Sequence, residues 1–467
     1  MIRVLLGLIL LFSFATVGAQ TEVSTPEVSL SPNSSPEAQR VLQFLAAVQN
    51  HPVVRAQAAL VAAARAQLEA VYSPVSFNAS GNYTRLNLDI PEAPPGQEPG
   101  QETPDLPNNL VGLNLGANFR PFVFGDTADL ARSRQIDLAK VELGYTETLS
   151  ALQAQALGAA AQVTVAEESL NLATESRTLT ESALAATRIR QTKGAAAESE
   201  VRALELQLRE ADNRLSSAGA NLAIARRSLV NLVGETEAPG LVRLEPVTGT
   251  PPDVRRAALD LELARVGAGG AGRALYPTAQ ASYTWPLGDE KSELALSLES
   301  RTLQPGVSYS YANPRQGAAG FSAPEGVPAS VLKGSFTVGV ALNISPETYG
   351  AVQAADARVV AAAAGLSAAL DNADITALSL QANYETAQLG LELAQQGVTD
   401  AVTTLQDVRA RLRLGLATEF EVSQARFALT QTRLNERSAE LNLLQATLDS
   451  YRTYAVPILP PAPEARP

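Results

Sequence analysis

Apolar residues recur at alternating steps of three and four positions along residues 201–229. Strict three-four spacing over four heptads predicts a supercoiled α-helix whose apolar seam packs against a neighbouring helix. Alanine layers in this seam allow the partner helix to approach closely. The seam comprises Val201, Leu204, Leu208, Ala211, Leu215, Ala218, Leu222, Ala225 and Leu229.

Two very long helices are predicted in each half of the chain. They cover about 126–193 and 197–233 in the first half, and about 346–414 and 418–454 in the second. A shorter helix leads each half, the first of them running from about Ser35 to Val71. At about 1.5 Å per residue, the helix over 126–193 would be about 100 Å long. Helices of globular proteins are usually no longer than about 20 residues, so this length indicates that the chain self-associates.

Four shorter segments alternate between apolar and small polar residues. They lie at about 75–90, 109–121, 277–286 and 334–344. A segment of about ten residues with one apolar face has the length and period of a membrane-spanning barrel strand. A soluble sheet with one wet face gives the same alternation. The export signal and the long helices, taken together, favour the membrane.

Four strands cannot close a barrel, and lipid does not tolerate an open sheet edge, so several copies of the chain must pool their strands. Three chains with four strands each would give about twelve, within the range of known barrels. Residues 292–312 read as an additional β-hairpin, which would raise the count to about eighteen if it also crossed the membrane. Because Arg301 separates its strands and serine is frequent, we expect this hairpin to lie outside the membrane.

The chain contains an internal duplication. Residues 52–66 match 252–266 at an offset of 200, and residues 190–201 match 411–422 at an offset of 221. The second half therefore carries about 21 additional residues between the two blocks, for which the 292–312 hairpin is the candidate. The predicted repeats cover 37–245 and 246–455.

The first nineteen residues read as a signal peptide, with Arg3 before an apolar stretch and Val17-Gly18-Ala19 as the cleavage site. A short N-terminal membrane anchor is the alternative, but the apolar stretch is short for a span. The polar linker at 20–36 and the proline-rich tail at 456–467 are expected to be ordered only where they dock on the rest of the chain. The proline- and glycine-rich segments at 91–109 and 314–329 are predicted to be exposed, mobile loops.

Composition excludes several classes of function. The formal net charge of −12 and the lack of a basic cluster argue against nucleic acid binding. The chain has no cysteine and a single histidine, His51, which excludes disulfides and Cys/His zinc sites. A Ser/His/Asp triad would have to use His51, which more simply stands beside the helix-initiating Pro52. A carboxylate-only calcium or magnesium site stays open on composition, but the sequence has no EF-hand-like spacing. We therefore expect no enzyme activity, no cofactor and no metal.

The chain resembles the TolC-like outer membrane efflux protein family over about residues 37–455. The resemblance rests on the NHPVVRAQAA motif, the duplicated order of elements, the strand-turn-helix segment RPFVFGD at 120–126, and a helix-turn-helix pattern. That pattern, R-x3-G-x-A-x3-E-V, occurs at 190–201 and again at 411–422. The expected fold class is a mostly helical α+β membrane protein: duplicated long coiled-coil helices form an α-helical tunnel, and each repeat adds two strands to a trimeric transmembrane β-barrel.

The resemblance also implies partners and a location. It implies a homotrimer in the outer membrane lipid, a twelve-strand barrel, and a tunnel extending into the periplasm. It further implies docking onto a periplasmic adaptor protein and an inner-membrane pump of RND or ABC type. The predicted function is a passive exit duct of a multi-component efflux or type I secretion system. The alternative is a periplasmic adaptor or scaffold protein without a pore, which the duplication disfavours.

Site residues follow from the same family pattern. An acidic residue six positions after the turn glycine lines the periplasmic constriction in that family, which points to Glu200 and Glu421 here, followed by Gln424. The simpler explanation of either glutamate is a solvated residue at a helix start. The resemblance places Arg190, Gly194, Arg411 and Gly415 in adaptor-facing turns, and both glycines are expected to adopt positive φ. Leu412, Ala417 and Gln424 depart from the family pattern, so the family's closed-state lock is not carried over.

Overall fold

The computed structural model describes residues 36–85, 109–120, 123–234, 239–287, 292–313, 334–342 and 344–461. The expected signal peptide at 1–19 lies outside the described residues. So do the polar segments at 20–36 and 91–109, apart from Pro36 and Asn109, and the segment at 314–329.

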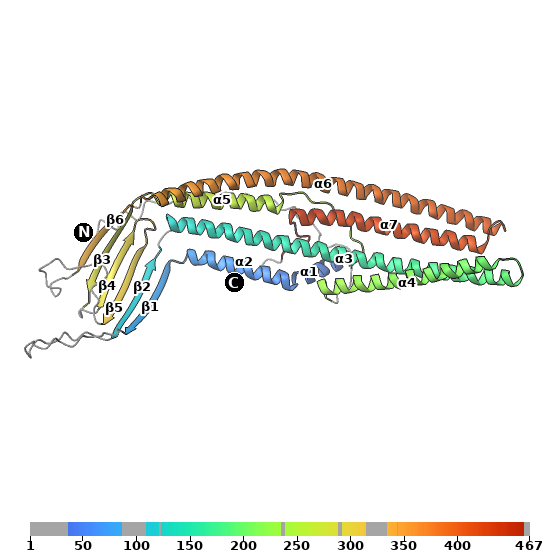
Figure 1. The fold of residues 1–467 in the computed structure, drawn as a ribbon, viewed down its shortest axis with the longest axis horizontal. Helices are drawn as coiled ribbons and strands as arrows, with labels where there is room; N and C mark the ends of the chain where they lie inside the picture. The colour runs from blue at the N-terminus through green and yellow to red at the C-terminus, as the bar shows by residue number, and fades with distance from the viewer. Residues whose placement is uncertain are drawn as a thin grey trace, which may run out of the picture.

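The described part of the chain forms seven helices and one six-stranded sheet, in an order that repeats (Figure 1). The first half contains α1 (Pro36–Gln49), α2 (Pro52–Val71), β1 (Val75–Arg85), β2 (Asn109–Phe119), α3 (Asp126–Thr192) and α4 (Glu198–Val233). The second half contains α5 (Pro252–Arg273), β3 (Thr278–Pro286), β4 (Ser292–Glu299), β5 (Pro305–Asn313), β6 (Ser335–Ala341), α6 (Pro346–Arg413) and α7 (Glu419–Tyr454).

The molecule is elongated, with the sheet at one end and the α3–α4 and α6–α7 turns at the other (Figure 1). The helices α2 and α4 both pack on α3, and α5 and α7 both pack on α6. Val201, Ala211 and Leu222 of the predicted seam are buried. Among the described residues, no helix is both long enough and apolar enough to cross a membrane.

The prediction of one continuous leading helix over 35–71 is wrong, because the helix breaks between α1 and α2. Pro52 has no N–H group, and its ring disfavours a helical conformation in the preceding residue. His51 accordingly has φ −59° and ψ 138° and serves as the N-cap of α2. Its Nδ1 accepts a hydrogen bond from the Val53 amide at 3.3 Å. The only histidine of the chain therefore has a structural role in this fold.

A compact core lies midway along the molecule, where α1, α3, α4 and α7 meet. Phe44, Leu157, Leu448 and Ile458 are each at most 2% exposed. Gln153 holds the chain after α7 in place: its Nε2 donates to the Leu459 carbonyl at 2.9 Å, and its Oε1 accepts from the Leu459 amide at 3.1 Å. The first part of the proline-rich segment at 456–467 is thus docked on α3.

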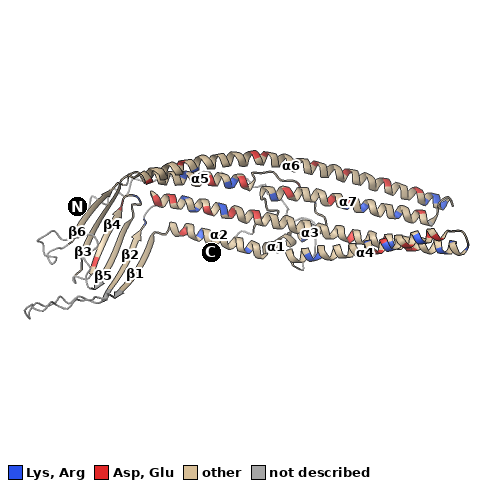
Figure 2. Ribbon diagram, viewed as in Figure 1, with Lys and Arg blue, Asp and Glu red and all other residues tan. Residues whose placement is uncertain are grey.

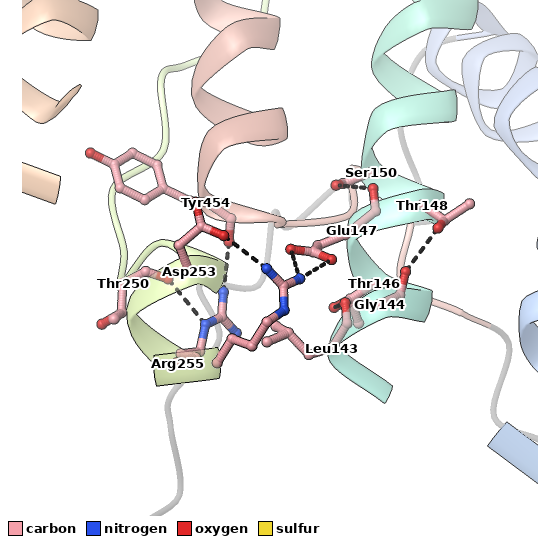
Figure 3. A network of polar contacts seen from close by, with 11 residues as sticks. Leu143, Gly144, Thr146, Glu147, Thr148, Ser150, Thr250, Asp253, Arg255 and Tyr454 are labelled. Atoms are coloured by element: carbon pink, nitrogen blue, oxygen red, sulfur yellow. Dashed lines mark hydrogen bonds and ion pairs between the residues drawn. The ribbon is translucent and has the colours of Figure 1, made fainter. Parts of the chain in front are cut away.

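A polar network ties α5 to α3 and to the end of α7 (Figure 3). Arg256 donates to both carboxylate oxygens of Glu147 on α3, at 2.7 and 2.8 Å. Arg255 donates to the carbonyl of Tyr454, the last residue of α7, at 2.7 Å, and to that of Thr250 at 3.1 Å. These contacts fix the start of the second repeat against α3 and α7.

The strands form one antiparallel sheet with the order β1-β2-β5-β4-β3-β6. The expectation of four sheet strands with a separate hairpin is wrong, because the hairpin β4–β5 occupies the middle of the sheet, between β2 and β3. Its strands have eight and nine residues and the same alternation as their neighbours. Pairing on both sides satisfies the backbone groups that a detached hairpin would leave at its edges.

The sheet has one apolar and one small polar face. Phe77, Leu115, Tyr283 and Val340 share the apolar face, and the first and last of these are 83% and 69% exposed. On the other face asparagines lie over glycines of the next strand, as Asn82 does over Gly112.

Candidate functional site

The α3–α4 and α6–α7 turns, at the end of the molecule away from the sheet, hold the predicted site residues (Figure 1). Gly194 has φ 73° and Gly415 has φ 72°. The prediction of positive φ at both positions is confirmed. This left-handed backbone, which glycine adopts without a steric penalty, reverses the chain at the end of a long helix.

Both turns use the same hydrogen bonds. The Ala195 amide donates to the Arg190 carbonyl at 2.8 Å, and the Leu416 amide donates to the Arg411 carbonyl at 2.8 Å. These 6→1 bonds satisfy carbonyl groups that a helix end otherwise leaves unpaired. Arg190 and Arg411 are thus equivalent in the two turns, as their positions in the sequence pattern indicate.

The starts of the two following helices differ. Thr418 caps α7: its hydroxyl accepts from the Glu421 amide at 3.2 Å, and its own amide donates to the Glu421 carboxylate at 2.6 Å. This reciprocal pair is a capping box. At the matching position before α4 stands Ala197, which has no side-chain oxygen and makes no side-chain cap. The Ala-Thr-Glu segment after Gly415 indicates a helix start at this position, and the Thr-x-x-Glu spacing is the signal of such a box.

The candidate constriction residues lie on the exposed sides of their helices. Glu421 and Gln424 are one helical turn apart and exposed, whereas Val422 and Ala425 are buried against α6. Glu200 is likewise exposed beside the buried Val201. Since α4 and α7 belong to different hairpins, a single chain contributes Glu200 and Glu421 from two separate tips.

Charged residues of both signs occur along the helices, the tips included, whereas the strands are almost free of them (Figure 2). Arg409, Arg411 and Arg413 lie near the end of α6, and Arg188 near the end of α3 donates to Glu205 of α4 at 2.7 Å. Among the residues that the structure describes, no three histidine or acidic side chains gather where they could hold a metal ion.

No protein-family model matches the sequence, and no curated protein matches it either. Several solved structures do match the fold. The outer membrane protein VceC from Vibrio cholerae has a TM-score of 0.61 and 15% identity, over 89% of this chain and 96% of that one. CusC, whose structures were described in relation to folding and transmembrane channel formation, has a TM-score of 0.60 and 16% identity, over 89% of this chain and 92% of that one. The MtrE outer membrane channel of Neisseria gonorrhoeae, in its open state, has a TM-score of 0.59 and 16% identity, over 89% of each chain.

These similarities extend over nearly nine-tenths of the chain. Because the sequence identities are low, the comparison establishes the fold alone. The resemblance predicted from the sequence is confirmed at this level: the chain has the fold of the outer membrane channel proteins.

Proposed function

We propose that this protein is a passive outer-membrane exit duct of a multi-component efflux or type I secretion system. In this proposal three copies pool their sheets into a transmembrane barrel. Their helices form a tunnel that extends into the periplasm and ends at the α3–α4 and α6–α7 tips. The duct performs no chemistry of its own.

The exposed apolar face of the sheet carries the proposal. Large side chains such as Phe77, Leu115 and Phe336 cover this face and are 40% or more exposed in the single chain. A contiguous apolar surface of this kind marks contact with lipid or with another protein. The opposite face, rich in serine, asparagine and glycine, suits a water-filled interior, and this is the alternation of barrel strands in outer membranes.

The sheet edges support assembly from several copies. In one chain β1 and β6 each have a single partner, and an open edge is not tolerated in lipid. β1 runs away from the helices and β6 runs back toward them, so β6 of one copy placed beside β1 of the next continues the antiparallel pattern (Figure 1). Exposed apolar residues on α6, among them Leu378 and Leu393, offer a further surface for a neighbouring copy to cover.

The tips support the remainder of the proposal. The turns containing Arg190, Gly194, Arg411 and Gly415 would face a periplasmic adaptor, which joins the duct to an inner-membrane pump of RND or ABC type. Glu421, Glu200 and Gln424 would line the constriction. A ring of carboxylates from three copies would favour cations.

Single-channel recording of the detergent-purified protein in a planar bilayer tests the proposal. Discrete, long-lived conductance steps with cation preference are expected. Glu421→Gln keeps the capping box but removes the charge, so it should shift the reversal potential toward that of a non-selective pore, as should Glu200→Gln. Glu69→Gln, an exposed change on α2 far from the tips, is the matched control and should leave selectivity unchanged. A protein that stays soluble without detergent and gives no steps would instead be an adaptor or scaffold.

A further inference from the structure

We propose that the β4–β5 hairpin crosses the outer membrane as part of the barrel wall, so that three chains close a barrel of eighteen strands. This inference rests on the proposed function and specifies the size of its membrane part. Six strands of each chain already form one continuous sheet, and three such sheets give eighteen strands.

The register of the sheet is the first argument. One row of cross-strand partners passes through the hairpin and is apolar across all six strands: Phe77, Ala117, Val307, Leu296, Tyr283 and Phe336. The adjacent row is polar or glycine across all six strands: Ser76, Asn118, Gly306, Ser297, Ser282 and Thr337. The hairpin thus presents the same two faces as the strands on either side of it. If the apolar face meets lipid on β2 and β3, it meets lipid on β4 and β5 between them.

Charge placement is the second argument. The two acidic residues of the hairpin strands, Glu293 and Glu299, share the polar face with Ser297. The apolar face of the hairpin carries only uncharged side chains over the described strands: Leu294, Leu296, Leu298, Val307, Tyr309 and Tyr311. Charges on a lipid-facing surface of a barrel cost a few kcal/mol each at mid-membrane, so their confinement to one face fits a strand pair that spans.

The position of Arg301 removes the reason for expecting the hairpin outside the membrane. Arg301 lies in the turn between β4 and β5, at the helical end of the sheet, where its Nη2 donates to the Arg273 carbonyl of α5 at 3.4 Å. In the same turn Gln304 donates to the Thr127 hydroxyl of α3 at 2.8 Å. The turn is therefore seated on the ends of two helices, beyond the apolar rows, where an arginine meets water or polar groups.

Strand length is the third argument. β4 has eight residues and β5 has nine, compared with seven in β6 and eleven in β1. At about 3.3 Å per residue, eight or nine residues extend about 26–30 Å. Tilted by about 40°, strands of this length rise about 20–23 Å, slightly less than the apolar band of about 25 Å in outer-membrane barrels. Both strands of the hairpin are longer than β6, so the hairpin reaches at least as far across the membrane as that edge strand of the sheet.

Six strands per chain change the width of the duct. With strands about 4.8 Å apart and tilted by about 40°, a twelve-stranded barrel has a radius of about 12 Å, and an eighteen-stranded barrel about 18 Å. The membrane part is then half as wide again as the resemblance to twelve-stranded ducts implies. Any size selection would fall to the tips rather than to the barrel.

Single cysteines test the placement directly, because the chain has none of its own. Leu296→Cys and Ala117→Cys lie in the same apolar row, on the hairpin and on β2 respectively, and Ser297→Cys and Asn118→Cys lie in the adjacent polar row. Each variant, reconstituted into liposomes, is treated with a membrane-impermeant maleimide. In a parallel sample it is labelled with a small fluorophore in detergent and reconstituted with brominated lipid.

Leu296→Cys is expected to behave like Ala117→Cys, reacting at least about tenfold more slowly than the polar-row cysteines because an apolar setting disfavours the thiolate. Brominated lipid should quench both apolar-row labels.

The outcomes separate this inference from the proposed function. Rapid aqueous labelling of Leu296→Cys beside a protected Ala117→Cys would place the hairpin outside the membrane and overturn the inference, while the duct would stand. Rapid labelling of both apolar-row cysteines without quenching would overturn the duct itself. Counting strands in a cryo-electron microscopy reconstruction of the unmodified assembly gives a second readout that needs no substitution: eighteen supports the inference, and twelve contradicts it.

Discussion

Gly125, the N-cap of α3, lies directly against the carbonyl oxygen of Arg301 in the turn between β4 and β5, so closely that no side chain fits between them. The backbone of Gly125 has φ 56°, a conformation that favours glycine. The hairpin turn and the start of the longest first-half helix are thus fitted to each other through one residue without a Cβ atom.

Gly125→Ala is expected to destabilise the protein. The added Cβ atom must displace the Arg301 turn, and the positive φ alone costs on the order of 1–3 kcal/mol in a residue with a side chain. The measurement is the thermal unfolding midpoint of the purified protein. Gly144→Ala, inside α3 with no atom within 4 Å of the new Cβ, is the matched control and should stabilise the helix by about 1 kcal/mol. Equal effects of the two substitutions would contradict the fitted contact.

The long helices were predictable from the sequence because their signal is local and repeated. The three-four seam from Val201 to Leu229 can be recognised without knowing the partner helix, and the turns at Gly194 and Gly415 are indicated by the glycines themselves. The break at His51 also has a local cause, because a proline restricts the backbone conformation of the residue before it. The predicted helix over 35–71 was wrong only because it was continued through Pro52.

The place of the hairpin in the sheet was not predictable in the same way. The alternation of residues 292–299 and 305–313 indicates two strands, but the choice of neighbour depends on segments nearly two hundred residues away, such as β2. In the sequence alone, the charged Arg301 between two strands argues against placing the hairpin in the membrane. In the structure it marks a turn seated on α3 and α5. Similarly, equal spacing made Glu200 and Glu421 look equivalent, whereas the caps before them differ.

The capping difference between the two tips predicts opposite effects of two substitutions. Thr418→Ala removes the cap of α7 and should cost about 1 kcal/mol. Ala197→Thr would create Thr-x-x-Glu before α4, with Glu200 in the role of Glu421, and should stabilise that tip by a similar amount. Hydrogen exchange of the amides in the first turns of α4 and α7 measures both. Slower exchange in α4 of Ala197→Thr is expected, and unchanged exchange there would show that Glu200 cannot complete the box.

Arg255 is expected to matter more than its counterpart Arg55 in the first repeat. Burial lowers the pKa of the Arg255 guanidinium, while the charge of Glu147 opposes this shift. The side chain donates to the carbonyl of the buried Tyr454. Arg255→Ala leaves that carbonyl without its donor, which costs about 1–3 kcal/mol. Arg55 is exposed on α2, so Arg55→Ala should change stability by no more than about 0.5 kcal/mol. Chemical unfolding of the two variants decides the matter, and a smaller loss for Arg255→Ala than for Arg55→Ala would contradict the role of this network.

Glu168 on α3 is expected to make stability fall as the pH rises. Desolvation raises the pKa of its carboxyl group above the ordinary value of 4.5, and it outweighs the opposing attraction of Arg437, whose Nε lies 3.3 Å away. The nearby Glu436 and Glu440 raise the pKa further. Because the folded state holds this proton more tightly than the unfolded state, the stabilisation is complete at low pH and is lost as the pH passes through the raised pKa.

Glu168→Gln removes this titration, so its unfolding midpoint should fall less than that of the unmodified protein between pH 4.5 and neutrality. Glu167→Gln changes the adjacent carboxylate, which pairs with Arg226 at 2.7 Å, and serves as the matched control that should keep the fall. Thermal unfolding of the three proteins across this pH range gives the comparison. Parallel curves for Glu168→Gln and the unmodified protein would mean that the attraction of Arg437 offsets the burial of Glu168 after all.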